Sequence, residues 1–315
     1  GPVVNATADL PIPPGPEWIR AQWNLAEGKA RSNKGGKPGA LLILDEVQKV
    51  PGWSEVVKEL WDLECRKREG INIIILGSSS LLIQKGLTES LAGRFFLHRC
   101  THWGFDEMEK AFSWDLDKWL FFGGYPGAAP FIGDEEKWSQ YVTDSLIETV
   151  LAKDVLQLQT VAKPALLRQL FMLAVVHPAQ ILSYNKMLGQ LQEAGNATTI
   201  LSYLKLLDAA MLLKPLERFS GNRIRQKISS PKLVLLNNAL VNASFPQKIN
   251  EIKMNDSRWG RLVENAVGAA LVNNNAGKAV EIFYWRDRDQ EIDFVLRQGE
   301  KVLGIEVKTG ARQSP

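Results

Sequence analysis

Cysteine and histidine are scarce in this 315-residue sequence, which has two cysteines and three histidines. Cys65 and Cys100 lie far apart, and neither belongs to a C-x-x-C motif. The sequence therefore favours neither a disulfide framework nor a zinc or thiol-redox site. His98, His102 and His177 have no ligand-like spacing, and we expect structural roles for them. Two free thiols suit the reducing environment of the cytoplasm, where we expect the protein to be.

Long apolar runs are also missing, and we expect no secretory leader. No stretch of about 18 apolar residues is present, so we expect no membrane span and no membrane partner. The net charge of +3 is too small to indicate a nucleic-acid partner by itself. With 45% hydrophobic residues, the chain can form two or three domains with real cores. It begins with Gly1-Pro2 and stops soon after a predicted strand, so we interpret it as a fragment cut at both ends.

The first hundred residues predict a parallel α/β sheet. Continuous apolar runs that end in polar residues are typical of strands buried on both faces of such a sheet. Helical spacing of apolar residues between these runs completes strand-helix-strand units. We expect strands at 3–9, 40–46, 72–80 and 95–99 and helices at 17–30 and 53–68.

A pair of acids follows the apolar run at 40–44. Asp45 and Glu46 come at the carboxyl end of that strand, where α/β sheets bind ligands. ATP hydrolysis needs one carboxylate to hold Mg²⁺, directly or through water, and a second to polarise the attacking water. Ser78 and Ser79 end the next strand and can contact the γ-phosphate or the water, and Arg94 can stabilise transition-state charge in a neighbouring subunit. The alternative is an ordinary α/β strand end without catalysis.

The middle of the chain predicts helices and then a winged helix-turn-helix. Residues 106–158 are helical in pattern, with a break at 123–127. A helix at 197–212 precedes a hairpin-like basic segment at 213–232, which is how a winged helix is built and how it meets phosphates. We expect contact with DNA phosphates there, from Arg218, Arg223, Arg225 and Lys227. The predicted recognition helix is poor in arginine, which argues against base readout, and a packing role is the alternative.

The last sixty residues predict a second set of acids. If Leu296 pairs with Lys301 across a turn at 297–300, Asp293 lies opposite Gly304 and diagonal to Glu306, close enough to share one Mg²⁺. Period two places Lys308 on the face of Glu306, where it can orient or deprotonate a water. Glu264, on a helix at 258–273, adds a fourth polar group. The alternative is a structural ion cluster in which Lys308 only neutralises the acids.

Two stretches resemble one family. The string Leu-Leu-Ile-Leu-Asp45-Glu46-Val-Gln-Lys-Val-Pro-Gly-Trp53, then Ile-Leu-Gly-Ser-Ser-Ser80 and Leu-Ala-Gly-Arg94, resembles bacterial and archaeal AAA+ type P-loop ATPases with an extra C-terminal domain of unknown function. The resemblance implies a Walker-B role for Asp45 and Glu46, a sensor role for Ser78 or Ser79 and a finger-like role for Arg94. The Gly-x-x-x-x-Gly-Lys-Ser/Thr loop of the family is absent from this sequence and would lie before residue 3.

The C-terminal segment is similar to the last domain of the same family. The residues that carry this likeness are Arg261-Leu-Val-Glu264-Asn265, Phe283-Tyr-Trp285-Arg286, Glu291-Ile-Asp293-Phe294 and Ile305-Glu306-Val-Lys308. An acid on a helix, an Asp on a strand and Glu-x-Lys on the next strand also resemble the PD-(D/E)XK nuclease fold.

We therefore predict a multidomain α/β protein. Its parts are an incomplete P-loop-type ATPase core at 1–105, a helical linker at 106–158, a winged helix at 159–245 and a truncated restriction-endonuclease-like domain at 246–315. The expected function is ATP binding and hydrolysis in the full-length protein, with Mg²⁺, coupled to the two C-terminal modules on DNA, with homo-oligomers as a further expectation. The alternatives are a DNA- or protein-binding regulatory module with an inactive nuclease fold, and an ATP-gated Mg²⁺-dependent nuclease.

Overall fold

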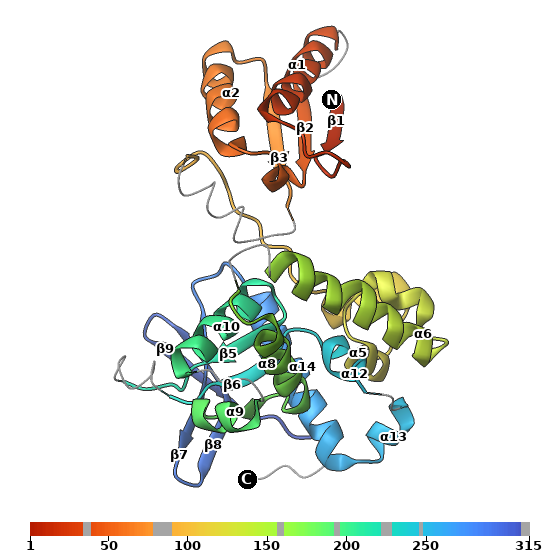
Figure 1. Ribbon diagram of the computed structural model, residues 1–315, viewed down its shortest axis with the longest axis vertical. Helices are drawn as coiled ribbons and strands as arrows, with labels where there is room; N and C mark the ends of the chain where they lie inside the picture. The colour runs from red at the N-terminus through yellow and green to blue at the C-terminus, as the bar shows by residue number, and fades with distance from the viewer. Residues whose placement is uncertain are drawn as a thin grey trace. The chain divides into compact units, whose positions relative to one another are not determined.

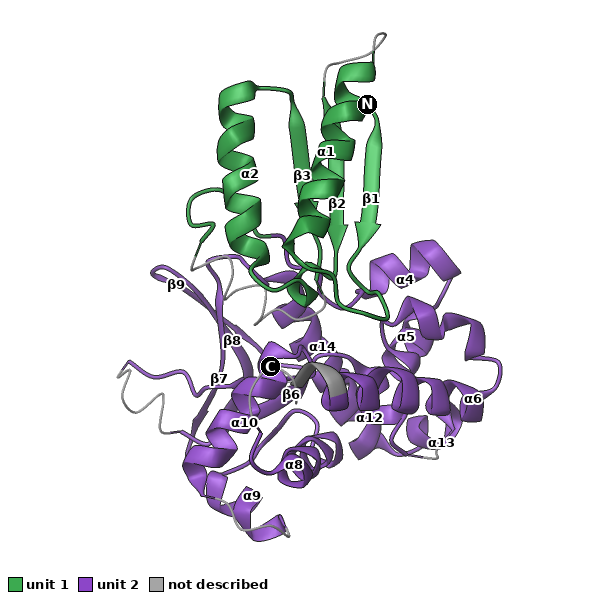
Figure 2. Cartoon of the chain, turned by 45° about the horizontal axis from the view of Figure 1, so that its top comes forward, with its two compact units in different colours: residues 1–97 green, residues 98–315 purple. Residues whose placement is uncertain are grey.

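The chain folds into two compact units, residues 1–97 and 98–315 (Figure 2). A computed structural model describes residues 1–33, 39–77, 90–155, 161–191, 196–221, 229–245 and 248–309. The architecture is mixed α/β, with a parallel three-stranded sheet at the N-terminus and two antiparallel sheets further on (Figure 1). None of the helices in the described ranges is long and apolar enough to span a membrane.

The first unit is a strand-helix-strand-helix-strand fold. All three strands run parallel, in the order β1-β2-β3, as the apolar runs predict. Its elements are β1 (Val3–Thr7), α1 (Pro16–Ser32), β2 (Ala40–Asp45), the 3-10 helix η1 (Val47–Lys49), α2 (Trp53–Lys67) and β3 (Ile71–Ile75).

The core of this unit lies between the helices and one face of the sheet. Alternate strand residues such as Leu42 and Leu44 are fully buried with Ile19 and Trp23 of α1, and α2 contributes Val57 to the same core. Each fully buried leucine of this kind contributes about 1.5–3 kcal/mol to folding. The two helices are also joined by an ion pair from Arg20 to Glu59, with 2.7 Å between Nη2 and Oε2.

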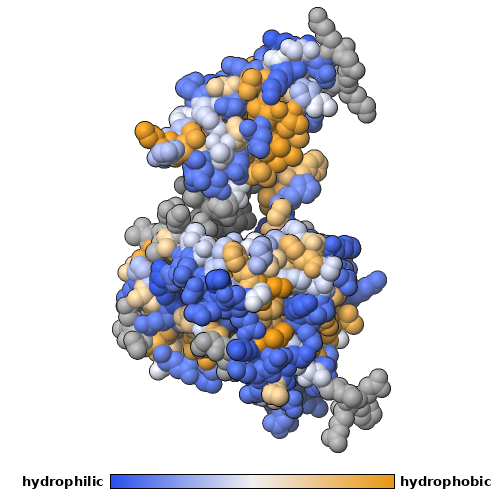
Figure 3. Space-filling view, turned by 90° about the vertical axis from the view of Figure 1, so that its right-hand side faces the viewer, coloured by the Kyte–Doolittle hydropathy of each residue, from blue (hydrophilic) through white to orange (hydrophobic). Residues whose placement is uncertain are grey.

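The other face of the sheet is only partly covered by the described residues. Leu41 and Ile43 are half-buried, whereas Val3 and Ile74 are 49% and 43% exposed. Hydrophobic surface is visible on this unit in Figure 3. The prediction that the strands are buried on both faces is therefore wrong for the described part of the unit, because α1 and α2 pack into one core.

The strand predicted at 95–99 is not formed. Residues 95–100 have no regular structure, and Phe96 is 95% exposed. An apolar run predicts a strand only where a neighbouring strand can satisfy its backbone hydrogen bonds, and the described residues give these positions no ladder partner. The run instead crosses the boundary between the two units, eight residues before the predicted boundary at 105.

The second unit begins with helices, broken near Gly123 as predicted. These elements are α4 (Phe105–Phe112), α5 (Leu116–Phe122), the 3-10 helix η2 (Pro126–Phe131), α6 (Glu135–Gln140), the π-helices η3 (Tyr141–Ile147) and η4 (Val150–Val155), and α8 (Pro164–Val176). Side chains define several helix starts, since Asp115 and Asp134 each accept a hydrogen bond from a backbone N–H three residues on.

Two antiparallel sheets follow, in the orders β4-β6-β5 and β7-β8-β9. The elements are β4 (Gln180–Ile181), α9 (Tyr184–Gln190), α10 (Ala197–Ala209), β5 (Leu213–Leu216), β6 (Lys232–Leu235), α12 (Asn238–Asn242), α13 (Ile249–Lys253), α14 (Asp256–Asn274), β7 (Glu281–Asp287), β8 (Gln290–Gln298) and β9 (Lys301–Ile305). The predicted hairpin between 213 and 232 corresponds to β5 and β6, which pair antiparallel.

One hydrophobic core joins the two sheets. Leu216 of β5 and Val234 of β6 are buried together with Ala269 of α14, Tyr284 of β7 and Phe294 of β8. The predicted boundary between residues 245 and 246 therefore falls inside a single packed unit.

The register of the last hairpin differs from the prediction. Gln298 pairs with Lys301, so the turn has two residues, Gly299 and Glu300, instead of four. Gly299 has a φ of 59°, and a glycine at positive φ is what two-residue hairpin turns favour. Continuing the pairing beyond Phe294 and Ile305 places Asp293 level with Glu306, not with Gly304.

Candidate functional site

The predicted ATPase acids lie at the carboxyl end of the middle strand of the parallel sheet. Asp45 is the last residue of β2 and pairs with Thr7 at the end of β1. Glu46 has a φ of 54°, a left-handed conformation that ends the strand. Its backbone N–H donates to Oδ1 of Asp45 over 3.0 Å.

Glu46 is held by its own loop. The side-chain amide of Gln48 donates to its Oε2 over 3.1 Å, and the ammonium of Lys49 lies 3.5 Å from the same oxygen. Lys49 also pairs with Asp9, which follows β1. Carboxylate ligands and a compensating lysine therefore meet at the edge where β1 and β2 end.

Arg94 is bound to α2 of its own chain. Its Nε and Nη2 donate to the two carboxylate oxygens of Asp62, at 2.9 and 3.3 Å. This hydrogen-bonded pairing raises the pKa of Arg94 and lowers the pKa of Asp62. Ser78 and Ser79, the predicted γ-phosphate contacts, lie outside the described residues.

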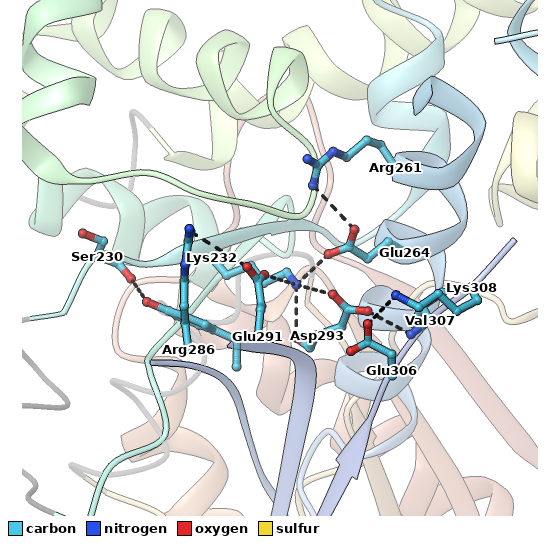
Figure 4. A network of polar contacts seen from close by, with 11 residues as sticks. Ser230, Lys232, Arg261, Glu264, Arg286, Glu291, Asp293, Glu306, Val307 and Lys308 are labelled. Atoms are coloured by element: carbon cyan, nitrogen blue, oxygen red, sulfur yellow. Dashed lines mark hydrogen bonds and ion pairs between the residues drawn. The ribbon is translucent and has the colours of Figure 1, made fainter. Parts of the chain in front are cut away.

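The C-terminal acids surround Lys232, a lysine for which the sequence predicts no separate role. Lys232, the first residue of β6, is fully buried (Figure 4). Its ammonium lies 2.6 Å from Oε1 of Glu264, 3.4 Å from Oδ1 of Asp293 and 3.6 Å from Oε1 of Glu291. It also donates to the backbone carbonyl of Asp293 over 3.1 Å and lies 4.9 Å from the ring centroid of Phe294.

Asp293 and Glu264, predicted as a metal ligand and a catalytic acid, face this ammonium. Oδ1 of Asp293 contacts Lys232, and its Oδ2 accepts from the backbone N–H of Val307 over 2.8 Å. Burial raises the pKa of Glu264, and the charge of Lys232 opposes that rise. The carboxylate of Glu264 also lies 3.6 Å from Arg261.

Glu306 and Lys308 form the outer part of the cluster. The ammonium of Lys308 donates to Oε1 of Glu306 over 2.6 Å, and both side chains are exposed. This hydrogen bond raises the pKa of Lys308, so the side chain stays protonated at neutral pH and is a poor general base. Glu291 has a second partner in Arg286, with 3.8 Å between Nη1 and Oε2.

The basic stretch predicted to meet DNA is only partly available. Arg218 is exposed, whereas Lys214 is paired with Asp208 over 2.7 Å. Arg223, Arg225 and Lys227 lie outside the described residues. Lys232, the last basic residue of the stretch at 213–232, cannot reach DNA because it is buried.

Lys232 is the functional residue that the sequence analysis missed. The signal was present in the sequence, since Lys232 starts the otherwise apolar run Lys-Leu-Val-Leu-Leu. A lysine in a strand whose four residues are all buried needs a compensating carboxylate. That reasoning predicts a carboxylate partner for Lys232, and the folded chain supplies Glu264, Glu291 and Asp293.

Comparisons with known proteins agree with part of this picture. Residues 20–109 match the family described as "AAA domain", and residues 113–251 and 259–315 match two families described as "Domain of unknown function", DUF8612 and DUF4143. An uncharacterized protein of Methanocaldococcus jannaschii, MJ1544, is 24% identical over 281 residues, which cover 83% of this chain and 59% of the relative. This chain thus spans about three fifths of that relative's length. No solved structure matches.

These matches assign AAA-type similarity to the N-terminal unit. AAA domains are typical of ATP-binding proteins, and the match includes Asp45, Glu46 and Arg94. The last match includes Glu264, Asp293, Glu306 and Lys308, in a domain whose function is unknown.

Proposed function

We propose that the protein containing this chain binds and hydrolyses ATP with Mg²⁺ at the carboxyl edge of the β1-β2-β3 sheet. The observation that carries the proposal is the position of Asp45 and Glu46 at the end of the central parallel strand, inside the segment similar to an AAA domain. Carboxylate oxygens are ligands that Mg²⁺ prefers, so the donor set fits the ion.

In this proposal the two acids have different tasks. Asp45 holds the Mg²⁺, directly or through water, and Glu46 accepts a proton from the attacking water. Bound Mg²⁺ neutralises charge on the β- and γ-phosphates. Asp45 is the last residue of the strand, and the left-handed backbone at Glu46 starts the loop that follows. Ser78 or Ser79 completes the contacts to the γ-phosphate.

Replacing Glu46 with Gln in the full-length protein tests the proposal. The amide keeps the size and the contact with Gln48 but cannot take a proton, so ATP turnover should fall by roughly 10²–10⁴-fold while ATP binding stays unchanged. Glu17→Gln, an exposed site on α1, is the matched control and should keep full turnover. Unchanged turnover in Glu46→Gln would remove Glu46 from the reaction.

Arg94 acts in this proposal on the nucleotide of a neighbouring copy in a homo-oligomer. Its present partner, Asp62, is more than a third exposed, so the guanidinium can leave it at small cost in stability. A role in the neighbouring site requires that Arg94→Ala lowers turnover only under conditions where the protein self-associates.

We further propose that residues 159–245 form a winged helix that binds DNA phosphates. The order α8, β4, α9, α10, β5, β6, with β6 between β4 and β5, supports this reading. Combined charge reversal at Arg218, Arg223 and Arg225 should weaken binding to duplex DNA and flatten its salt dependence. Unchanged binding would favour a packing role for this module.

For residues 246–315 we propose a nuclease-like fold that binds DNA or a protein but does not cleave DNA. Each acid of the cluster already has a cationic partner, which favours this reading over an ATP-gated, Mg²⁺-dependent nuclease. The backbone N–H of Val307, between Glu306 and Lys308, donates to Oδ2 of Asp293, and this proximity is the observation that supports cleavage. Incubation of the protein with plasmid DNA, Mg²⁺ and ATP distinguishes the non-cleaving fold from the nuclease. Cleavage that Lys308→Ala abolishes would establish the nuclease.

A further inference from the structure

We propose that the ammonium of Lys232 is the built-in cation of the acidic cluster on α14 and β8, in the place where a divalent metal ion would otherwise bind. Removing this ammonium should open a divalent-cation site. The inference uses only residues of the second unit, so it stands apart from the proposed ATPase activity.

The contacts of Lys232 use all of its hydrogen-bonding capacity. An ammonium has three N–H donors, and Glu264 Oε1, the Asp293 carbonyl and Asp293 Oδ1 lie at 2.6, 3.1 and 3.4 Å. A fourth oxygen, from Glu291, lies 3.6 Å away. Phe294 closes one side with its ring face. The lysine is therefore seated in a complete shell of oxygen atoms from a helix and a strand.

A divalent ion would need the same oxygens. Mg²⁺ takes oxygen ligands at about 2.1 Å, and Glu264 and Asp293, each 14% exposed, are the least exposed carboxylates that the cluster can offer. The ammonium lies between them, and it cannot share that position with a dication. The lysine and a metal ion are therefore alternatives at one place.

The charges of the cluster also cancel without a metal. Its four carboxylates, each in an ion pair with a basic side chain, are Glu264, Glu291, Asp293 and Glu306. Within the part of the chain that the structure describes, the cations paired with them are Lys232, Arg261, Arg286 and Lys308, also four. A divalent ion would add two positive charges to a neutral cluster and would repel Lys232 directly, so the native cluster offers it no electrostatic gain.

Burial keeps Lys232 in this role. Its side chain is fully buried and Glu264 and Asp293 are each 14% exposed, so the ion pairs are only weakly screened by solvent. Moving the ammonium away would leave two largely buried carboxylates without their closest cation, which is strongly unfavourable.

Mn²⁺ binding to the full chain, measured by electron paramagnetic resonance, tests the inference. The wild type and Asp293→Asn should bind the same amount of Mn²⁺, because Asp293 ligates no metal in the native cluster. Lys232→Met, which keeps the length of the side chain without its charge, should bind one additional Mn²⁺. Adding Asp293→Asn to Lys232→Met should abolish that extra site. Other acidic groups, such as Glu27, Glu64 and Glu69, are present in every variant and cancel in these differences.

Circular dichroism identifies which variants fold. If Lys232→Met does not fold, the comparison of the wild type with Asp293→Asn, or with the milder Glu291→Gln, decides: equal Mn²⁺ binding supports the inference. Loss of a Mn²⁺ ion in either acid variant overturns it, because the native acids would then hold metal. A folded Lys232→Met that gains no ion also overturns it.

Discussion

His102 is a half-buried imidazole with both ring nitrogens engaged in hydrogen bonds. Nε2 lies 2.7 Å from the carbonyl of Met211, and Nδ1 lies 3.4 Å from the side-chain amide of Asn237. The carbonyl can only accept, so Nε2 carries the hydrogen and Nδ1 accepts from Asn237. The ring of Tyr125 packs edge-on at 5.2 Å. Burial lowers the pKa of His102 because the charged form loses its hydration.

This arrangement predicts a loss of stability in mild acid. Because the folded-state pKa lies below the unfolded value of about 6.5, the unfolded chain binds the proton more tightly. The contribution is fully present above pH 6.5 and is lost as the pH falls through the lower folded pKa. Urea unfolding between pH 7.5 and 5 should show this decline in the wild type. It should be smaller in His102→Gln, whereas His98→Gln, at an exposed position, should behave like the wild type.

The turn between α5 and η2 shows how an element is fixed by close backbone contacts. Gly123 has a φ of 72°, and a Cβ on Gly124 would lie 1.9 Å from the carbonyl oxygen of Trp103. The N–H of Gly124 donates to Oδ1 of the buried Asn237 over 3.0 Å. Only glycine fits where three chain segments approach so closely.

Gly124→Ala should therefore lower the stability of the second unit by more than about 2 kcal/mol, through overpacking and loss of the hydrogen bond to Asn237. Chemical denaturation gives the value. Gly133→Ala is the matched control, since nothing lies within 4 Å of a Cβ at that position, and it should change stability little. A tolerated alanine at 124 would mean that the turn relaxes more easily than its contacts indicate.

Strands with a strong local pattern could be predicted from the sequence. The apolar run at 40–44 gave β2 to within one residue and placed Asp45 and Glu46 at its end. The run at Phe95–Leu97 has a similar composition but no strand partner among the described residues, so composition alone was misleading there. A local pattern reports what a segment can bury, and the partner is decided by tertiary structure.

In the C-terminal cluster, too, the local sequence pattern predicts some features, and others depend on tertiary structure. Its acids were found because they lie close in sequence on one hairpin and its preceding helix. The register of the β8–β9 hairpin differs from the prediction because Gly299 and Glu300 form a two-residue turn, whereas the prediction assumes a four-residue turn. The role of Lys232 is not predictable in this way. It lies on β6, 32 residues before Glu264 on α14, and only the folded chain brings the two side chains together.

On the scale of the whole molecule, the two units have separate hydrophobic cores. Among the described residues, the core that contains Leu42 is formed by residues between Val4 and Leu91, and the core that contains Leu216 is formed by residues of the second unit. Each unit therefore has its own source of stability, and damage to one core should not be transmitted fully to the other.

If the two cores are independent, calorimetry of the full chain should show two unfolding transitions. Leu42→Ala should lower the free energy of unfolding of the first unit only, and Leu216→Ala that of the second unit only. Each loss should be about 2–5 kcal/mol, because both side chains are at most 1% exposed. The identical substitution in the two cores makes each variant the control for the other. A single transition that both changes shift together would contradict independent cores.

Lys232 also has a consequence for how the second unit folds. A partly folded chain in which β6 is packed but β8 has not docked leaves the ammonium with Glu264 but without Asp293 or Glu291. Such a state is costly, as is the reverse state with desolvated acids and no lysine. Intermediates that contain only one of the two sheets are thus penalised. The buried ion pair suppresses half-assembled forms, so the two sheets should dock in a single cooperative step.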